Sequence, residues 1–325
     1  MQGSGWLQFA FYLVALVIIT KPIGLYLLRV LDANGRTWLD PVLRPLERGT
    51  YHVMGVDPNR EHNWKQYTFA MLLFSLIGCL FTYAILRLQY FLPLNPQGLA
   101  GVTPDCSFNT ATSFTTNTNW QSYVGETTMS YFSQMVGLAF HNFVSAATGI
   151  AIAAALVRGI ARHTATTIGN FWVDLVRVTY YLLLPICLVF ALFLVSQGMI
   201  DNFKSYTKAT LIEPMKIQVE KKNDQGETIK DADGKAVMEG QTVTDQNIVQ
   251  GPMASQIAIK MLGTNGGGYA NANAAHPFEN PTPLSNFVQM LSIFAIGSGL
   301  TYYLGRMVKN QKHGWTVWAV MLALF

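Results

Sequence analysis

Apolar residues in this chain are concentrated in long blocks, and these blocks limit the possible fold more than any other feature. A helix needs ~20 apolar residues to cross a bilayer, and five blocks reach about this length. They cover Trp6–Leu28, Gln66–Leu88, Met129–Val157, Gly169–Val195 and Leu284–Leu304. Only 12% of the 325 residues are Asp, Glu, Lys or Arg, whereas soluble domains usually carry about 25%. We therefore predict an all-α protein that spans a membrane several times.

Charge and cysteine content argue against several classes of function. The formal net charge of +4 is not gathered in one basic stretch, so nucleic-acid binding has no support. Cys79, Cys106 and Cys187 have spacings that suit neither a disulfide framework nor a metal site. The first apolar block lacks a basic leader and a small-residue cleavage site. We expect it to be retained as a helix, with Lys21-Pro22 as a tolerated break.

Basic loops alternate with loops that are not basic. Residues 29–65, 158–168 and 306–312 carry Lys and Arg, whereas residues 89–128 carry none. This alternation follows the positive-inside rule and places the basic loops in the cytoplasm. The N-terminus is then external. The loop 198–250 is also external and is long enough to translocate regardless of its charge.

Some charged and polar residues lie at or inside the predicted spans. Arg158 and Arg162 are interpreted as topology charges. Asp174 and Arg177 are three residues apart on a helix face, so we expect them to pair with each other. His141 and Asn142 lie inside the third span, and His141-Asn142 is either part of a conduction path or engaged in interhelical hydrogen bonds.

Two further segments are too polar to span the membrane, yet each begins with a short helix. These helices are predicted at Thr103–Thr116 and Pro252–Leu262. Thr103 is expected to cap the first helix, with Pro104 at the first helical position and Asp105 in the first turn. Such a helix is at most ~20 Å long and cannot cross a bilayer alone.

The two short helices and the turns after them are copies of one unit. Thr116-Asn117-Thr118-Asn119 matches Thr264-Asn265-Gly266-Gly267 at an offset of 148 residues. Further on, Ser130–Met135 matches Ser285–Met290 at an offset of 155 residues, which predicts an insertion within Ala272–Pro283. Each unit reads as span, short helix, polar turn and span. A repeat of this kind in a membrane protein usually places a site on the axis between the copies.

The chemistry of both turns favours a monovalent cation. A short helix that ends at a turn directs its negative dipole end there, and carbonyl oxygens can replace the hydration shell of an ion. Gly266, Gly267 and Gly268 allow the dihedral angles that this requires. Neither turn contains a carboxylate, which argues against calcium or magnesium. Asp105 and Glu126 flank the first turn, where they can raise the local cation concentration. Taken alone, either turn is also typical of an ordinary surface turn.

Both turns lie within longer strings that carry a family pattern. These strings are Phe114–Tyr123 and Met261–Gly268, followed by Asn271-Ala272-Asn273 and His276–Pro281. They resemble the KdpA family, the potassium-binding, channel-like subunit of the bacterial Kdp potassium-transporting ATPase. The resemblance covers the whole chain. It implies a fold related to potassium channels, in which four such units and ten spans in one chain surround a selectivity filter.

The resemblance also implies function and partners. It implies potassium as the substrate, no covalently bound cofactor, and a multi-pass protein of the bacterial inner membrane. The implied partners are the ATPase subunit KdpB, the accessory subunit KdpC, the small single-span KdpF and membrane lipid. This chain lacks the Asp-Lys-Thr-Gly phosphorylation motif, so ATP hydrolysis is expected in KdpB. The alternatives are an ATP-independent channel or ion-coupled transporter of the same superfamily, and a non-conducting membrane scaffold.

By resemblance, the filter strands are Thr116–Gln121 and Thr264–Gly268. Asn117 and Thr264 are expected to contribute oxygens to the ion, while Gln121 and Gly266 match positions where the filter is sensitive to change. The candidate filter residues are Thr116, Asn117, Thr118, Asn119, Gln121, Thr264, Asn265, Gly266, Gly267 and Gly268.

The domain organisation follows from these units. Residues 1–65 are expected to form an extra N-terminal span and a cytoplasmic connection. Residues 66–162 form the first repeat, and residues 163–312 form the second. Residues 313–325 begin a further apolar run, so the chain is expected to be an N-terminal part with two of four repeats.

Overall fold

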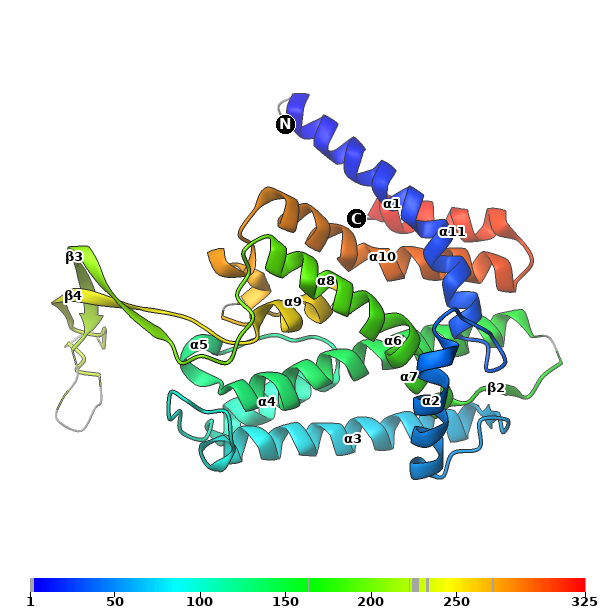
Figure 1. The fold of residues 1–325 in the computed structure, drawn as a ribbon, viewed down its shortest axis with the longest axis horizontal. Helices are drawn as coiled ribbons and strands as arrows, with labels where there is room; N and C mark the ends of the chain where they lie inside the picture. Colours follow the sequence, from blue (N-terminus) through cyan, green and yellow to red (C-terminus); the bar gives the residue numbers. More distant parts are fainter. Residues whose placement is uncertain are drawn as a thin grey trace.

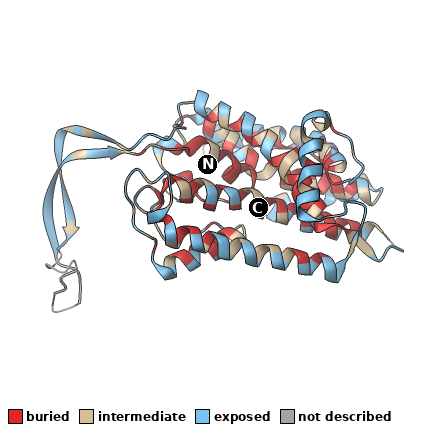
Figure 2. Cartoon of the chain, turned by 60° about the horizontal axis from the view of Figure 1, so that its bottom comes forward, coloured by how far each residue is buried: buried red, intermediate tan, exposed pale blue. Residues whose placement is uncertain are grey.

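The computed structural model describes residues 3–162, 164–221, 223, 228–231, 234–270 and 272–324. Within these ranges, five helical segments are long and apolar enough to cross a membrane, which confirms the predicted all-α membrane architecture. They are Gly5–Val30, Trp64–Phe91, Ser133–Ala161, Phe171–Ser196 and Pro283–Met307. Most of these helices run along the long axis of the molecule in Figure 1, and buried residues gather where they face one another in Figure 2.

The described part of the chain contains helices and two pairs of antiparallel strands. The helices are α1 (Gly3–Val30), α2 (Asp40–Met54), α3 (Trp64–Leu88), α4 (Pro104–Thr115), α5 (Gly125–Thr128), α6 (Phe140–Ala161), α7 (Phe171–Arg177), α8 (Leu184–Ser196), α9 (Met253–Leu262), α10 (Pro283–Met307) and α11 (Gln311–Leu324). The strands are β1 (His62–Asn63), β2 (Thr167–Gly169), β3 (Thr207–Glu220) and β4 (Met238–Ile248); each of the pairs β1–β2 and β3–β4 is antiparallel.

Both predicted short helices are present, as α4 and α9. Helix α4 packs against α3, and α9 packs against both α8 and α10. Thr103 occupies the N-cap position of α4, but its side chain makes no capping hydrogen bond, so that part of the prediction was wrong. The hydroxyl bonds to the carboxylate of Asp105 instead, which lowers the pKa of Asp105.

Helix α1 continues through Pro22 without interruption, so the predicted break is absent. It packs along α10, where two glycines permit a close approach. A Cβ added at Gly24 would lie 2.9 Å from the carbonyl oxygen of Gly299. Small residues at a helix contact are typical of packing between membrane helices.

Two of the long helices contain π-helical segments, at Ser133–Ala139 and Val178–Leu183. The second has a local cause in Pro185, which has no N–H and cannot bond to the carbonyl of Tyr181. The hydroxyl of Tyr26 donates to that carbonyl at 2.6 Å. A neighbouring helix thus satisfies the group that proline left free, as membrane depth requires.

The connection at residues 29–65 is not purely polar, because it contains α2. Pro41 lies in the first turn of this helix, and Gly55 ends it with φ of 64°. Helix α2 crosses one end of the bundle in Figure 1. Its inner face buries Glu47 and Tyr51, and its outer face exposes Val42, Leu46 and Val53. The sequence interpretation missed this helix because the face that it buries carries Glu47 and Tyr51, whereas several of its apolar side chains are exposed.

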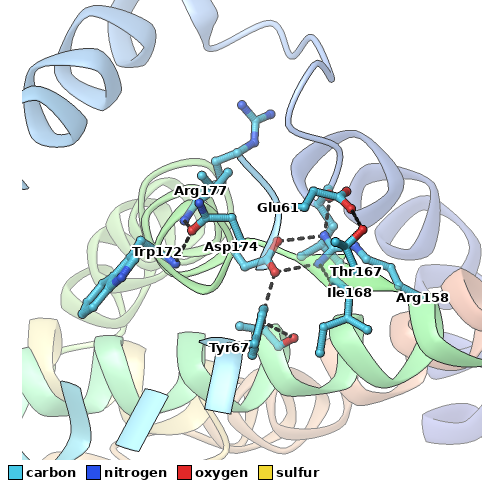
Figure 3. Close-up of polar contacts among 12 residues, drawn as sticks. Glu61, Tyr67, Arg158, Thr167, Ile168, Trp172, Asp174 and Arg177 are labelled. Atoms are coloured by element: carbon cyan, nitrogen blue, oxygen red, sulfur yellow. Dashed lines mark hydrogen bonds and ion pairs between the residues drawn. The ribbon is translucent and has the colours of Figure 1, made fainter. Parts of the chain in front are cut away.

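Asp174 does not pair with Arg177, which corrects the predicted pairing. The carboxylate of Asp174 accepts two hydrogen bonds from the guanidinium of Arg158, at 2.6 Å and 2.8 Å, and one from the hydroxyl of Tyr67 at 3.0 Å. Figure 3 shows Arg177 directed away from Asp174. Arg158 is therefore more than a topology charge: it is a buried ion-pair partner that joins α6 to α7.

Arg177 is also buried, and its partner comes from α2. Its guanidinium donates to the carboxylate of Glu47 at 3.0 Å and to the carbonyl of Val30 at 2.7 Å. Arg158 likewise donates to the carbonyl of Leu31 at 2.6 Å. Both guanidinium groups thus bind free carbonyls at the end of α1. A buried charge needs this many partners, and a single neighbour three residues away does not supply them.

The two ends of the molecule differ. Figure 1 places the basic connections, around α2, β2 and the turn between α10 and α11, at one end. The hairpin β3–β4 projects from the other end, and most of its residues are exposed (Figure 2).

Candidate ion-binding site

The first turn is closed by hydrogen bonds to the end of α4. The carbonyl of Ser113 accepts from the backbone N–H groups of Thr118 and Asn119, at 2.9 Å and 3.1 Å. Asn117 and Asn119 have φ of 62° and 52°. These left-handed conformations are uncommon for residues other than glycine and turn the chain sharply. The carbonyls of this turn therefore do not all continue the direction of the helix.

The second turn repeats this pattern at the end of α9. The carbonyl of Lys260 accepts from the N–H groups of Asn265 and Gly266, at 3.0 Å and 3.4 Å. Thr264 and Gly266 have φ of 56° and 87°. Both turns thus have the same two hydrogen bonds and two left-handed residues at the same spacing.

The shared pattern corrects the register of the repeat by one residue. It equates Asn117 with Thr264 and Asn119 with Gly266, whereas the matched strings equated Thr116 with Thr264. The Thr-Asn string occurs in both turns, but its backbone conformation does not, so string similarity alone gave the wrong register. Asn117 and Thr264, which are expected to contribute oxygens, are structurally equivalent.

Asn117 connects the two turns through its side chain. Its Oδ1 accepts from the hydroxyl of Ser145 at 2.8 Å and from the amide of Asn265. Its Nδ2 donates to the carbonyl of Gly263 at 3.2 Å. Because two donors occupy Oδ1, the backbone carbonyl is the oxygen of Asn117 that remains available to accept a further contact.

Gln121 forms a second connection between the segments that follow the two turns. Its Oε1 accepts from the N–H of Gly268 at 2.8 Å, and its Nε2 donates to the carbonyl of Gly268 at 3.1 Å. The ammonium of Lys260 donates to the same carbonyl. Gln121 therefore holds the two strands together.

His141 has hydrogen bonds to two other helices. Its Nδ1 lies 2.7 Å from the hydroxyl of Thr82, and its Nε2 lies 3.2 Å from that of Thr115. The interhelical bond, one of the two alternatives for this residue, is thus present. Asn142 is fully buried beside the turns, and its side-chain amide finds no hydrogen-bond partner in the described part of the chain.

Comparison with known proteins assigns the chain to a family. The family described as "KdpA: Potassium-transporting ATPase A subunit" matches residues 10–325. The chain belongs to the KdpA family. The resemblance seen in the two turns is therefore confirmed.

Similar proteins in the KdpA family carry one description. The chain is 53% identical over 326 residues to the potassium-transporting ATPase potassium-binding subunit of Koribacter versatilis, covering 100% of this chain and 53% of that protein. It is 54% identical over 325 residues to the protein so named in Bradyrhizobium diazoefficiens, covering 100% of this chain and 52% of that protein. The chain spans about half the length of the curated relatives that it matches.

A small cavity lies beside the structurally equivalent residues of the two turns. Asn117 and Thr264 both line a space of about 150 Å³. Its walls include Gly149 of α6 and Gly297 of α10. The hydroxyl of Thr264 donates to the carbonyl of Gly263 at 2.7 Å, which leaves its own oxygen free to accept. Neutral oxygens therefore adjoin a space large enough for an ion or a water molecule.

Sequence reasoning missed two charged residues behind the second turn. Lys260 and Glu279 are both fully buried. The carboxylate of Glu279 accepts from the N–H groups of Tyr269 and Ala270, the latter at 3.1 Å. Lys260 was hidden inside an apolar helix, whereas Glu279 belonged to the string His276–Pro281 that carried the family resemblance.

Proposed function

We propose that this chain belongs to the translocating subunit of an ATP-driven potassium uptake complex. In this proposal it binds and selects potassium at the external side and passes the ion through the membrane. The observation that carries the proposal is the direct connection of the two equivalent turns by Asn117 and Gln121, with Thr264 beside the cavity. The names of the relatives, potassium-transporting ATPase potassium-binding subunits, support the same function.

The geometry supports an ion without its hydration shell. Helices α4 and α9 both end at the turns, so their negative dipole ends lie beside any cation held there. The left-handed residues Asn117 and Thr264 change the direction of the carbonyls, and neutral oxygens are the ligands that potassium filters use.

The ring around the ion is proposed to need more than these two units. Residues 66–162 and 163–312 supply two pore-loop repeats, residues 1–65 supply the extra span and its connection, and residues 313–325 begin a further span. Two additional repeats of the full-length subunit complete the filter in this proposal. KdpB supplies ATP hydrolysis, and KdpC and KdpF complete the complex in the inner membrane with the N-terminus external.

The experiment is potassium-stimulated ATP hydrolysis by the complex in proteoliposomes. A complex with this function hydrolyses ATP faster as external potassium rises, and Gly266→Asp raises the half-saturating potassium concentration. Gly266 has φ of 87°, and the nearest atom to an added Cβ is Oδ1 of Asn273 at 4.0 Å. The matched variant Gly266→Ala therefore carries the backbone strain without the charge.

The outcomes separate the alternatives. Potassium flux through this subunit without ATP indicates a channel or an ion-coupled transporter. If the complex shows neither potassium flux nor potassium-stimulated ATP hydrolysis, the result indicates a non-conducting scaffold. Equal half-saturating concentrations for wild type and Gly266→Asp contradict the assignment of the filter.

A further inference from the structure

Lys260 is a buried cation beside the proposed filter, and the function described so far does not use it. It lies in the last turn of α9 and has no exposed surface. Its Nζ donates to the carbonyl of Gly268 and lies 5.3 Å from the ring centre of Phe114. Burying an ammonium group is costly unless acceptors compensate for the lost water, so a lysine at this position requires an explanation.

The equivalent residue in the first unit has a similar contact. The hydrogen-bond pattern of the turns equates Ser113 with Lys260, because each carbonyl closes its own turn. The hydroxyl of Ser113 donates to the carbonyl of Trp120 at 3.1 Å, in the strand that follows the first turn. Both short helices thus hold the following strand from the same position, and only the second does so with a charge.

The contact of Lys260 determines which carbonyls remain available. The carbonyl of Gly268 accepts from both Lys260 and Gln121, so its two lone pairs are used within the protein. The same two side chains, Gln121 and Lys260, also lie close to Gly267. A Cβ added at Gly267 would lie 3.0 Å from Oε1 of Gln121 and 3.1 Å from Nζ of Lys260. The strand is thus held tightly against both side chains.

A buried carboxylate balances the charge of Lys260. Glu279 acts on the ammonium electrostatically, and its carboxylate binds the N–H groups of Tyr269 and Ala270, the two residues after Gly268. The ammonium and the carboxylate therefore hold adjacent parts of one strand. A neutral pair of side chains would preserve the charge balance but lose the ammonium donor.

We propose that Lys260 is a specificity-determining positioning residue of the filter. Its ammonium holds the carbonyl of Gly268 out of the ion path, so that the second turn coordinates the ion only through Thr264–Gly267. This fixed geometry favours potassium over cations of other sizes. The inference rests on the proposed function, since it concerns the same filter.

The test compares potassium with rubidium in the assembled, reconstituted complex. We expect Lys260→Met to raise the half-saturating potassium concentration by about tenfold or more, because a hydrogen bond from a charged donor is lost. The maximal rate of ATP hydrolysis should stay within about twofold, since positioning affects ion binding rather than the ATPase partner. The ratio of half-saturating rubidium to potassium should fall towards one.

Two further variants make the test specific. Lys260→Met with Glu279→Gln removes both charges, so it avoids an unbalanced buried carboxylate and serves as the readout when the single variant does not assemble. It should be as defective as Lys260→Met. Ser113→Ala is the matched control in the first unit. It removes a neutral donor and should raise the half-saturating potassium concentration less than Lys260→Met does.

Three results would overturn the inference. One is unchanged potassium affinity and rubidium discrimination in both Lys260 variants. The second is recovery of wild-type values in the double variant, which would mean that Lys260 only neutralises Glu279. The third is a Ser113→Ala shift as large as that of Lys260→Met. Absence of potassium-stimulated hydrolysis in the wild-type complex would instead refute the proposed function, so the two failures are distinguishable.

Discussion

The side chain of Gln121 and the backbone of Gly268 are joined by two hydrogen bonds, of 2.8 Å and 3.1 Å. Gln121 follows the first turn and Gly268 ends the second strand, so these bonds set the spacing of two segments that are far apart in the sequence. A residue in this position acts on the ion through the geometry that it maintains.

Gln121→Glu should weaken potassium binding. The substitution removes the Nε2 donor and places a carboxylate oxygen against the carbonyl of Gly268, which separates the two strands. We expect the half-saturating potassium concentration for ATP hydrolysis to rise by about tenfold, because an unpaired buried group costs ~1–3 kcal/mol. Gln66→Glu is the matched control, since Gln66 caps the start of α3 and glutamate serves equally well there. An equal shift in both variants would contradict this role of Gln121.

The partners of the buried arginines can be tested by double-mutant cycles on thermal stability. Arg158 and Asp174 are in contact at 2.6 Å, so removing one partner should destabilise the protein by ~3–5 kcal/mol. The cycle of Arg158→Met with Asp174→Leu should show a coupling energy above ~1 kcal/mol. A cycle of Asp174→Leu with Arg177→Met should show a smaller coupling. A larger coupling energy for Asp174 with Arg177 than for Asp174 with Arg158 would support the pairing that the sequence suggested.

The exposed pair of Arg162 and Glu61 predicts a weak pH dependence of stability. Hydrogen bonds from Arg162, at 2.8 Å and 3.1 Å, lower the pKa of the Glu61 carboxyl from 4.5. A lowered pKa in the folded state contributes stability above the unfolded pKa, and this contribution is lost as the pH falls through the folded value. Glu61→Gln should therefore lower stability at pH 7 by less than ~1 kcal/mol, because both side chains are partly exposed.

The measurement for Glu61 is the melting temperature at two pH values. Wild type and Glu61→Gln should differ slightly near pH 7 and converge as the pH falls through the lowered pKa of the folded protein, where the wild-type carboxyl becomes protonated. A difference that grows as the pH falls would show that the ion pair is not its source.

Local patterns were sufficient to predict most of the helical elements. Apolar blocks of sufficient length gave the five spans, and proline at the start of an otherwise polar segment gave α4 and α9. Hydropathy did not reveal α2, because its buried face consists of Glu47 and Tyr51 and is held by Arg177 from a distant helix. A face buried through polar contacts produces no apolar signal.

Long-range contacts account for the rest of the differences. Asp174 and Arg177 satisfied the spacing rule for a helix pair, yet burial gave each a partner from another part of the chain. The register of the two turns depends on hydrogen bonds to Ser113 and Lys260, which string similarity does not detect. Lys260 itself gave no signal, because a single lysine in an apolar helix is indistinguishable in sequence from one that faces water.

In the loop 198–250, the alternating residues of Lys216–Glu220 and Thr228–Lys230 predict two strand-like stretches around a turn at Gly226. Lys216–Glu220 lies within β3, and Lys230 pairs with Ala236. The turn predicted at Gly226 lies outside the described residues. The apolar run at Trp315–Phe325 belongs to a longer helix, α11, which begins at Gln311.

The most direct test of the account is equilibrium binding of potassium to the purified complex without ATP. We predict saturable potassium binding that sodium does not displace, and binding weakened by about tenfold or more in Gly266→Asp, where a side chain is forced into a left-handed turn and a charge is added. Gly266→Ala should fall between the two. Equal potassium affinity in wild type and Gly266→Asp would contradict the claim that these two turns form the potassium filter.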